Sequence, residues 1–121
     1  AFEEVCLQHI SQIKYALHIG AVSSQESSLI VKGNEEAEGM QIDLLIDRAD
    51  DAVNVCEMKF YKAPYAVTKG YAQVLNSRLQ ALEEKNPTKT FLLTYVGNSE
   101  LVSNEYSDIF RASVTLDDLF I

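Results

Sequence analysis

Two acids and a lysine are the residues of this 121-residue chain whose types and spacing suggest chemistry. Asp43 lies in the segment QIDLLID, and Glu57 and Lys59 lie in VNVCEMKF; both segments have the pattern of β-strands. Successive side chains of a strand point to opposite faces, so Glu57 and Lys59 share one face. Because an unpaired charge in a protein interior costs several kcal/mol, these charges need partners or a function.

The register of a hairpin between the two segments decides whether Asp43 joins the other two residues. A three-residue loop over residues 49–51 pairs Arg48 with Ala52 and puts Asp43 opposite Glu57, with Cβ atoms about 5 Å apart. Two carboxylates at this spacing repel each other. The repulsion is relieved if a divalent cation lies between them, or if one carboxyl group keeps its proton.

Oxygen ligands at this spacing suit Mg²⁺ or Mn²⁺, which proteins commonly hold with one or two carboxylates, water and a substrate phosphate. Such an ion would polarise a phosphodiester, and Lys59 would orient the attacking water or offset charge on the phosphate. Glu3 borders the apolar stripe of a predicted first helix and would add a carboxylate from above the sheet. The structural alternative is a cross-strand salt bridge of Asp43, Glu57 and Lys59 near an exposed edge.

The elements that must position these residues follow the order α-β-β-β-α-β and end in a less regular tail. Apolar periodicity and breaker residues predict this order. The long second helix would then cross over between the third and fourth strands, which predicts an α/β fold with a mixed central sheet flanked by helices. The predicted elements are a helix from Phe2 that Gly20 ends, a strand ending at 29–31, a turn at 33–36, strands at 41–47 and 53–60, a helix at 68–85, strands at 90–96 and 112–115, and a last helical turn at 116–120.

Periodicity also assigns faces within these elements. Strand alternation puts Ile42, Leu44 and Ile46 on one face and Asp43 on the other. In the long helix, apolar residues from Tyr71 to Leu82 form the predicted buried stripe. The charged residues of this helix that are predicted to lie outside the stripe are Arg78, Glu83 and Lys85.

The charge of the chain is strongly negative but uneven. The net charge of −8 argues against nucleic acid as a partner. However, residues 59–89 carry 6 basic and 2 acidic side chains, whereas residues 1–58 carry 3 basic and 11 acidic ones. The basic segment either holds a phosphate chain, with Lys62 and Lys69 as candidate nucleic-acid contacts, or is the solvated face of a helix.

Composition predicts one globular domain over residues 1–121, since 47% of the residues are hydrophobic and 23% are charged. Cys6 and Cys56 lack the spacing of a metal or redox motif and are predicted to be buried free thiols in a reducing compartment. No apolar run reaches the roughly 18 residues of a membrane span, so we expect a cytoplasmic protein without membrane contact. The sequence contains no GxxxxGK[ST] loop, so this segment is not expected to bind a nucleotide in that way.

Asp43 in QIDLLID, followed by Glu57-Met58-Lys59, resembles the PD-(D/E)XK nuclease motif, and the order of elements resembles the core of that superfamily. The chain looks more specifically like the domain of unknown function at the C-terminus of certain archaeal and bacterial AAA-type ATPases. This likeness covers nearly the whole chain, in FEEVC, GMQIDLLIDR, CEMKFYKAPYAVTKGYAQ and VTLDDLF. It implies a restriction-endonuclease-like fold and, with no initiator Met and a start inside a helical pattern, a fragment of a longer ATPase.

The resemblance also implies roles for individual residues. Ile42 stands where the family has Pro, which leaves the metal site intact. In some members a Gln and a Tyr on the following helix complete the site, and Gln73 is a candidate although its order and spacing relative to Tyr71 do not match. The implied roles are metal binding by Asp43, Glu57, the backbone carbonyl of Met58 and the helix-one acid Glu3, with Lys59 as the catalytic lysine.

Two hypotheses follow. The first is a Mg²⁺- or Mn²⁺-dependent nuclease domain, acting on DNA rather than RNA, appended to a P-loop ATPase. The second is a non-catalytic interaction or regulatory domain of the ATPase that keeps the same fold. Both imply the N-terminal ATPase domain of the parent chain as a partner and allow a homo-oligomer. Because the chain is acidic, we expect the isolated fragment to bind nucleic acid weakly.

Overall fold

The structure, a computed structural model, describes residues 2–31, 40–115 and 117–118. Their order confirms the predicted α-β-β-β-α-β sequence of elements, while the predicted turn at 33–36 and most of the last helical turn lie outside the described residues. The elements are α1 (Phe2–Gln8), α2 (Ile10–Ala16), β1 (Ser24–Val31), β2 (Met40–Arg48), β3 (Ala52–Lys59), α3 (Lys69–Lys85), β4 (Thr90–Gly97), the 3-10 helix η1 (Ser107–Ile109) and β5 (Ala112–Thr115).

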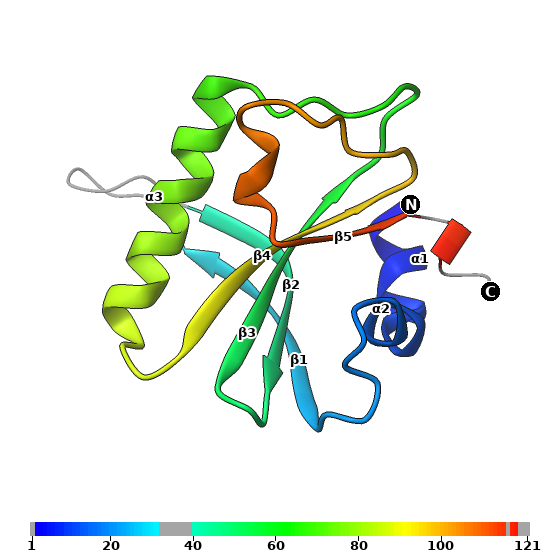
Figure 1. Cartoon of the computed structure of the whole chain (residues 1–121). Coiled ribbons are helices and arrows are strands. Elements are labelled where there is room, and N and C mark those ends of the chain that lie inside the picture. Colours follow the sequence, from blue (N-terminus) through cyan, green and yellow to red (C-terminus); the bar gives the residue numbers. More distant parts are fainter. Residues whose placement is uncertain (1, 32–39, 116, 119–121) are drawn as a thin grey trace.

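The strands form one five-stranded mixed sheet in the order β1-β2-β3-β4-β5. The pairs β1–β2 and β2–β3 are antiparallel, whereas β3–β4 and β4–β5 are parallel. A parallel neighbour requires a crossover, and α3 supplies it between β3 and β4. Figure 1 shows α3 on one side of the sheet and α1 and α2 on the other. The fold is therefore α/β, with helices on both faces of a mixed sheet.

Two apolar clusters fill the layers between the sheet and its helices. The cluster under α1 and α2 includes Ile13, Leu44 and Met58, and both cysteines are buried free thiols within it, as predicted. The cluster under α3 includes Val55, Leu75 and other apolar side chains. Because β3 contributes alternate residues to both clusters, it is buried on both faces along most of its length.

The hairpin between β2 and β3 has the predicted register, with pairs from Leu44–Cys56 to Asp47–Val53. Its connection is the three-residue loop at 49–51, in which Asp51 has a φ of 65°. A three-residue hairpin loop commonly ends in a left-handed residue, a conformation that Asp tolerates better than most residues. The odd loop length thus keeps the two strands in the register on which the candidate site depends.

The first helix differs from its prediction. The apolar stripe predicts one helix ending at Gly20, but the structure has two helices with a break at His9, and the second ends at Ala16. His9 Nδ1 donates a hydrogen bond of 2.7 Å to the Val5 carbonyl, and His18 adopts a φ of 61° just beyond the helix. The left-handed turn therefore comes two residues before the glycine. Within the described residues, no helix is both long and apolar enough to cross a membrane.

Candidate functional site

Glu57 is a buried acid on the α3 side of the sheet, with 6% of its surface exposed. The Tyr71 hydroxyl donates a hydrogen bond to Glu57 Oε2 at 3.1 Å. Arg78 Nη1 donates to Glu57 Oε1 at 3.4 Å and forms an ion pair with it. Both carboxylate oxygens are thus held by donors from one helix, which reduces the cost of burying the charge.

The spacing of residues in α3 brings both donors to the same place. Tyr71, Leu75, Arg78 and Leu82 are separated by 4, 3 and 4 residues, so they form one stripe along the helix. Leu75 and Leu82 in this stripe are buried against the sheet. The prediction that Arg78 points outward was therefore wrong, because this charged residue lies within the apolar stripe and pairs with the buried Glu57.

Burial raises the pKa of the Glu57 carboxyl above its ordinary value. Arg78, the hydrogen bond from Tyr71, and Lys59 oppose this shift by favouring the charged form, whereas the nearby Asp43 charge adds to it. Burial also raises the pKa of the Tyr71 hydroxyl, and the negative charge of Glu57 raises it further. Tyr71 therefore stays a neutral hydrogen-bond donor at physiological pH.

Lys59 ends β3 on the same face as Glu57. Its Nζ lies 4.4 Å from the centroid of the Tyr71 ring and 5.8 Å from that of Tyr65, both within range of a cation–π contact. The Tyr71 side chain thus contacts Glu57 through its hydroxyl and Lys59 through its ring. The structure brings together the acid and the amine of the ExK motif, with Tyr71 between them.

Asp43 lies at an irregularity in β2 that the alternating pattern did not predict. Between the pairs Ser27–Leu45 and Leu29–Ile42, β1 has the single residue Ser28, whereas β2 has both Asp43 and Leu44. This two-against-one arrangement is a β-bulge, which reverses the alternation of side chains beyond it. The prediction that Ile42 and Leu44 share a face was accordingly wrong, since Ile42 packs in the α3 cluster and Leu44 in the opposite one.

The bulge also changes the surroundings of the Asp43 carboxylate. The described pairs of β2 and β3 begin at Leu44–Cys56, one position short of the predicted Asp43–Glu57 pair. Gln41 Nε2 donates to Asp43 Oδ1 at 3.4 Å, and Asp43 lines a hollow of about 300 Å³ together with Leu7 of α1. The negative charge of Asp43 thus raises the pKa of Glu57. The hollow that Asp43 lines, however, is not lined by Glu57.

The other predicted site residues vary in their placement. The side chain of Met58 is buried under α1 and α2, on the face opposite Glu57. Lys62 and Lys69 are exposed. Gln73 is exposed too, and its position in the helix, about 200° around the axis from Tyr71, turns it away from Glu57. Glu3 belongs to α1, but its side chain lies outside the described residues.

The residues described support a carboxylate site only in part. They contain no group of three or more His, Cys, Asp or Glu side chains that could hold a metal ion. Asp43 and Glu57 are nevertheless the hard oxygen donors that Mg²⁺ accepts in pairs, together with water and phosphate. Each oxygen of Glu57 accepts one hydrogen bond, from Tyr71 or from Arg78, and keeps a second lone pair that could bind an ion.

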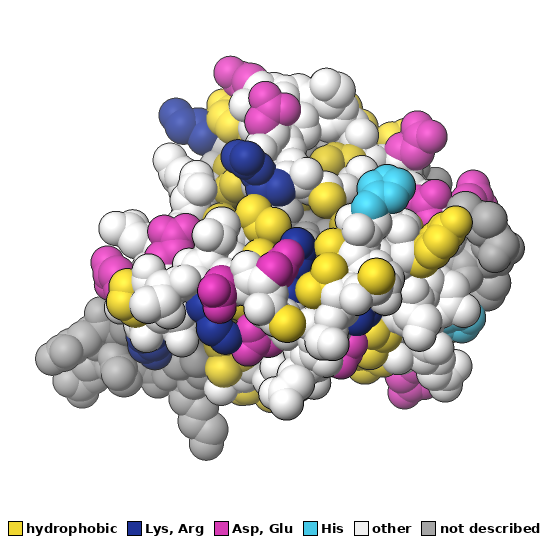
Figure 2. Space-filling model, turned by 60° about the horizontal axis from the view of Figure 1, so that its bottom comes forward, with side chains coloured by type: hydrophobic (Ala, Val, Ile, Leu, Met, Phe, Trp, Pro, Cys, Tyr) yellow, Lys and Arg dark blue, Asp and Glu magenta, His cyan; other side chains and the backbone are white. Residues whose placement is uncertain are grey.

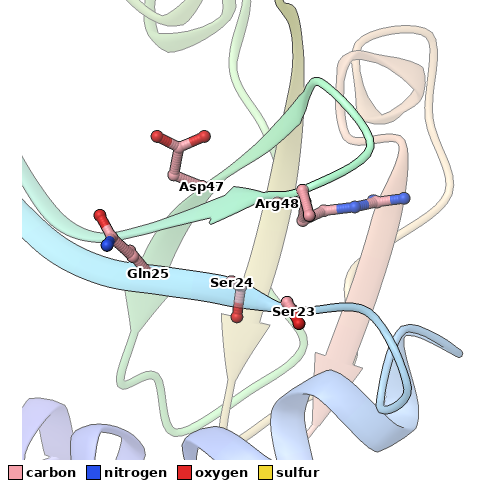
Figure 3. Close-up of a pocket in the computed structure, with 6 residues that line it drawn as sticks. Ser23, Ser24, Gln25, Asp47 and Arg48 are labelled. Atoms are coloured by element: carbon pink, nitrogen blue, oxygen red, sulfur yellow. The ribbon is translucent and has the colours of Figure 1, made fainter.

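A separate hollow of about 400 Å³ lies at the other end of the sheet, where β1 begins and β2 ends. Figure 3 shows that the side chains of Asp47 and Arg48, which line it, point away from each other. Arg48 is already engaged, because it donates hydrogen bonds to Asp50 and to the buried Asn54. Because Arg48 has these structural partners, we do not propose a catalytic role for this hollow.

No family model matches the sequence, and no curated protein matches it with significance. One solved structure, that of the protein of unknown function AF1548, is similar in fold, with a TM-score of 0.53 at 18% sequence identity. The similarity covers 84% of this chain and 51% of that protein, so this chain spans about half the length of the structure that it matches. At this identity the comparison shows the mixed α/β fold alone.

Proposed function

We propose that this chain is a Mg²⁺- or Mn²⁺-dependent phosphodiesterase domain with a restriction-endonuclease-like fold, which hydrolyses DNA in preference to RNA. The observation that carries the proposal is the meeting of Glu57 and Lys59 at Tyr71. This group lies toward the carboxyl ends of the parallel strands β3 and β4, the region where open α/β sheets bind ligands. Asp43 lies close enough to Glu57 for its negative charge to raise the pKa of the Glu57 carboxyl.

The chain's own residues have distinct parts in this proposal. The Lys59 amine orients the attacking water or offsets the charge that develops on the phosphate. Tyr71 and Arg78 fix the Glu57 carboxylate and favour its charged form. Asp43 and Glu57 would hold the divalent ion, which when bound supplies charge stabilisation and lowers the pKa of water. In the hydrolysis, the water oxygen bonds to phosphorus, one ester P–O bond breaks, and the leaving oxygen takes up a proton.

The contacts that Glu57 makes with Tyr71 and Arg78 favour a second function. Since Arg78 and Tyr71 already occupy both of its oxygens, the acid has the contacts of a structural ion pair. A domain with the same fold and this closed pair would serve as an interaction or regulatory domain of a longer protein. In either case we propose an ATPase domain of the parent chain as the partner, which rests on the resemblance of the sequence to the C-terminal domain of AAA-type ATPases.

A cleavage assay separates the two functions. Wild-type protein is incubated with single-stranded and duplex DNA in Mn²⁺, in Mg²⁺ or in EDTA, alongside Lys59→Met. The first function predicts cleavage by the wild type only with metal, and a loss of about 100-fold or more in Lys59→Met. Lys85→Met, an exposed change at the far end of α3, is the matched control and should cleave normally. A folded wild type that cleaves nothing would favour the interaction domain. A Lys59→Met variant with full activity would instead contradict the role proposed for Lys59.

A further inference from the structure

Tyr61 is an exposed aromatic residue two positions beyond Lys59 in the chain. Its side chain lies outside the apolar core, with 51% of the residue exposed, whereas the nearby Tyr95 is fully buried. The apolar core therefore does not enclose the Tyr61 ring, and about half of the residue stays open to solvent.

The position of Tyr61 is fixed by its backbone. Its N–H donates to Asn98 Oδ1 at 2.7 Å, and its carbonyl accepts from Asn98 Nδ2 and from Ser99 Oγ, each at 2.8 Å. Asn98 and Ser99 directly follow β4, so these bonds tie the segment after β3 to the end of the neighbouring strand. The ring is therefore presented to solvent from a fixed main chain, which lowers the entropy lost when something binds to it.

The ring is also continuous with the aromatic cluster that reaches the candidate site. Tyr61 packs edge-on against Tyr65, with centroids 5.1 Å apart, and Tyr65 stacks on Tyr95 at 5.9 Å. Tyr65 also contacts the edge of Tyr71, whose hydroxyl binds Glu57. A ligand on Tyr61 would thus lie at the surface end of the same cluster that holds Glu57 and Lys59.

Charge explains why such a ring would be needed for binding nucleic acid. Lys59 lies over Tyr65 and Tyr71, and the exposed Lys62 directly follows Tyr61. Figure 2 shows acidic and basic side chains interspersed on the face that comes forward from the bottom of Figure 1, and the chain as a whole carries a net charge of −8. Phosphate contacts alone therefore give little affinity here. Stacking of a base on an aromatic ring adds about 1–3 kcal/mol without relying on charge.

We propose that Tyr61 is a stacking platform for an unpaired nucleobase, so that the strand bound beside Glu57 and Lys59 is single-stranded or locally unpaired. In a duplex the faces of the bases are covered by their neighbours and only their edges are accessible. A ring on a fixed main chain can stack only on a base that has left the helix or was never paired. This inference deepens the proposed function and rests on it for the position of the phosphate.

The test measures binding in EDTA, so its result does not depend on cleavage. Fluorescence anisotropy of a labelled single-stranded oligonucleotide at low salt is compared for wild type, Tyr61→Ala and Tyr61→Phe. We expect Tyr61→Ala to weaken binding by about 5- to 150-fold, the equivalent of one stacked base, and Tyr61→Phe to keep it. Tyr15→Ala removes a tyrosine that is 71% exposed on α2 and should leave binding unchanged.

Two further substrates make the test specific to stacking. The same oligonucleotide annealed to its complement, and one with abasic sites, should bind the wild type more weakly and show no effect of Tyr61→Ala. The inference is overturned if the wild type binds no single strand, if Tyr61→Ala binds like the wild type, or if it weakens duplex and single strand equally. Binding that depends on Tyr61 in a protein that never cleaves would instead overturn the proposed hydrolysis alone.

Discussion

Arg78 Nη1 lies 3.4 Å from Glu57 Oε1, in an ion pair whose acid side chain is 8% exposed and whose basic side chain is 26% exposed. Glu57 is the more deeply buried partner, so loss of the pair would cost more free energy for the Glu57 carboxylate than for the Arg78 guanidinium. Burial alone would favour the neutral acid, and Arg78 is the strongest influence that keeps it charged. The consequences of this asymmetry are testable.

Replacing Arg78 with Met should destabilise the protein because it leaves the Glu57 carboxylate buried with one donor fewer. We expect the free energy of unfolding at neutral pH to fall by about 1–3 kcal/mol, measured by urea denaturation. The double variant Arg78→Met, Glu57→Gln removes the charge that was left behind and should recover part of the loss. Equal stabilities of the single variant and the wild type would show that the pair contributes nothing.

Glu57 should also make stability depend on pH in a particular direction. Its pKa is raised above the ordinary value of 4.5, so the folded protein holds this proton to higher pH than the unfolded chain does. As pH rises from 4.5 through the folded pKa, this group therefore lowers the free energy of unfolding, and the loss remains above that range. Glu57→Gln cannot titrate, so its stability relative to the wild type should rise with pH and then level off.

Chemical denaturation across this pH range checks the prediction, with Glu83→Gln as the control. Glu83 is an exposed acid on the same helix, so its replacement is the matched control for removing a carboxyl group that is not buried. A Glu57→Gln difference that falls as pH rises would mean that the folded protein lowers the pKa of Glu57 instead.

Gly97 allows the Tyr95 ring to lie across the end of β4. A Cβ at Gly97 would collide with the Tyr95 hydroxyl and the ring carbon that bears it. That hydroxyl donates to the Ser99 carbonyl at 2.6 Å, and Ser99 in turn donates to the Tyr61 carbonyl. We expect Gly97→Ala to cost about 1–3 kcal/mol by overpacking and to lower the melting temperature.

A second glycine provides the control for this change. Gly70 lies in α3, and a Cβ there meets nothing within 4 Å. Gly70→Ala should therefore be neutral or stabilise the protein by up to about 1 kcal/mol, since Ala favours helix more than Gly does. Similar melting temperatures for Gly97→Ala and the wild type would mean that the tyrosine moves aside at no cost.

Much of the fold could be predicted from periodicity, because each element has a simple pattern. The odd hairpin loop and the alternation of β3 gave the correct register of β2 and β3, and the parallel crossover followed from the long helix between two strands. The break at His9 left no signal, since the apolar stripe continues through it. Two short helices and one long helix can carry the same spacing of apolar residues.

The candidate site was harder to predict because it depends on exceptions to these patterns. The bulge at Asp43 and Leu44 could not be inferred, since Ile42 and Leu44 are both apolar and fit either face of the strand. Arg78 could have been found, because it lies three residues after Leu75 and four before Leu82 in the buried stripe. A charged residue inside an apolar stripe indicates a buried partner, which here is Glu57.

The central claim, that Asp43 and Glu57 bind a divalent ion together, is tested most directly by titrating Mn²⁺ into the protein while following its thermal stability. The wild type should gain about 2.7 kcal/mol when the free ion reaches about 100 times its dissociation constant. Asp43→Ala and Glu57→Gln should not respond, whereas Asp108→Asn, an exposed change in η1, should respond like the wild type. A wild type that does not respond, or variants at residues 43 and 57 that respond equally, would contradict the claim.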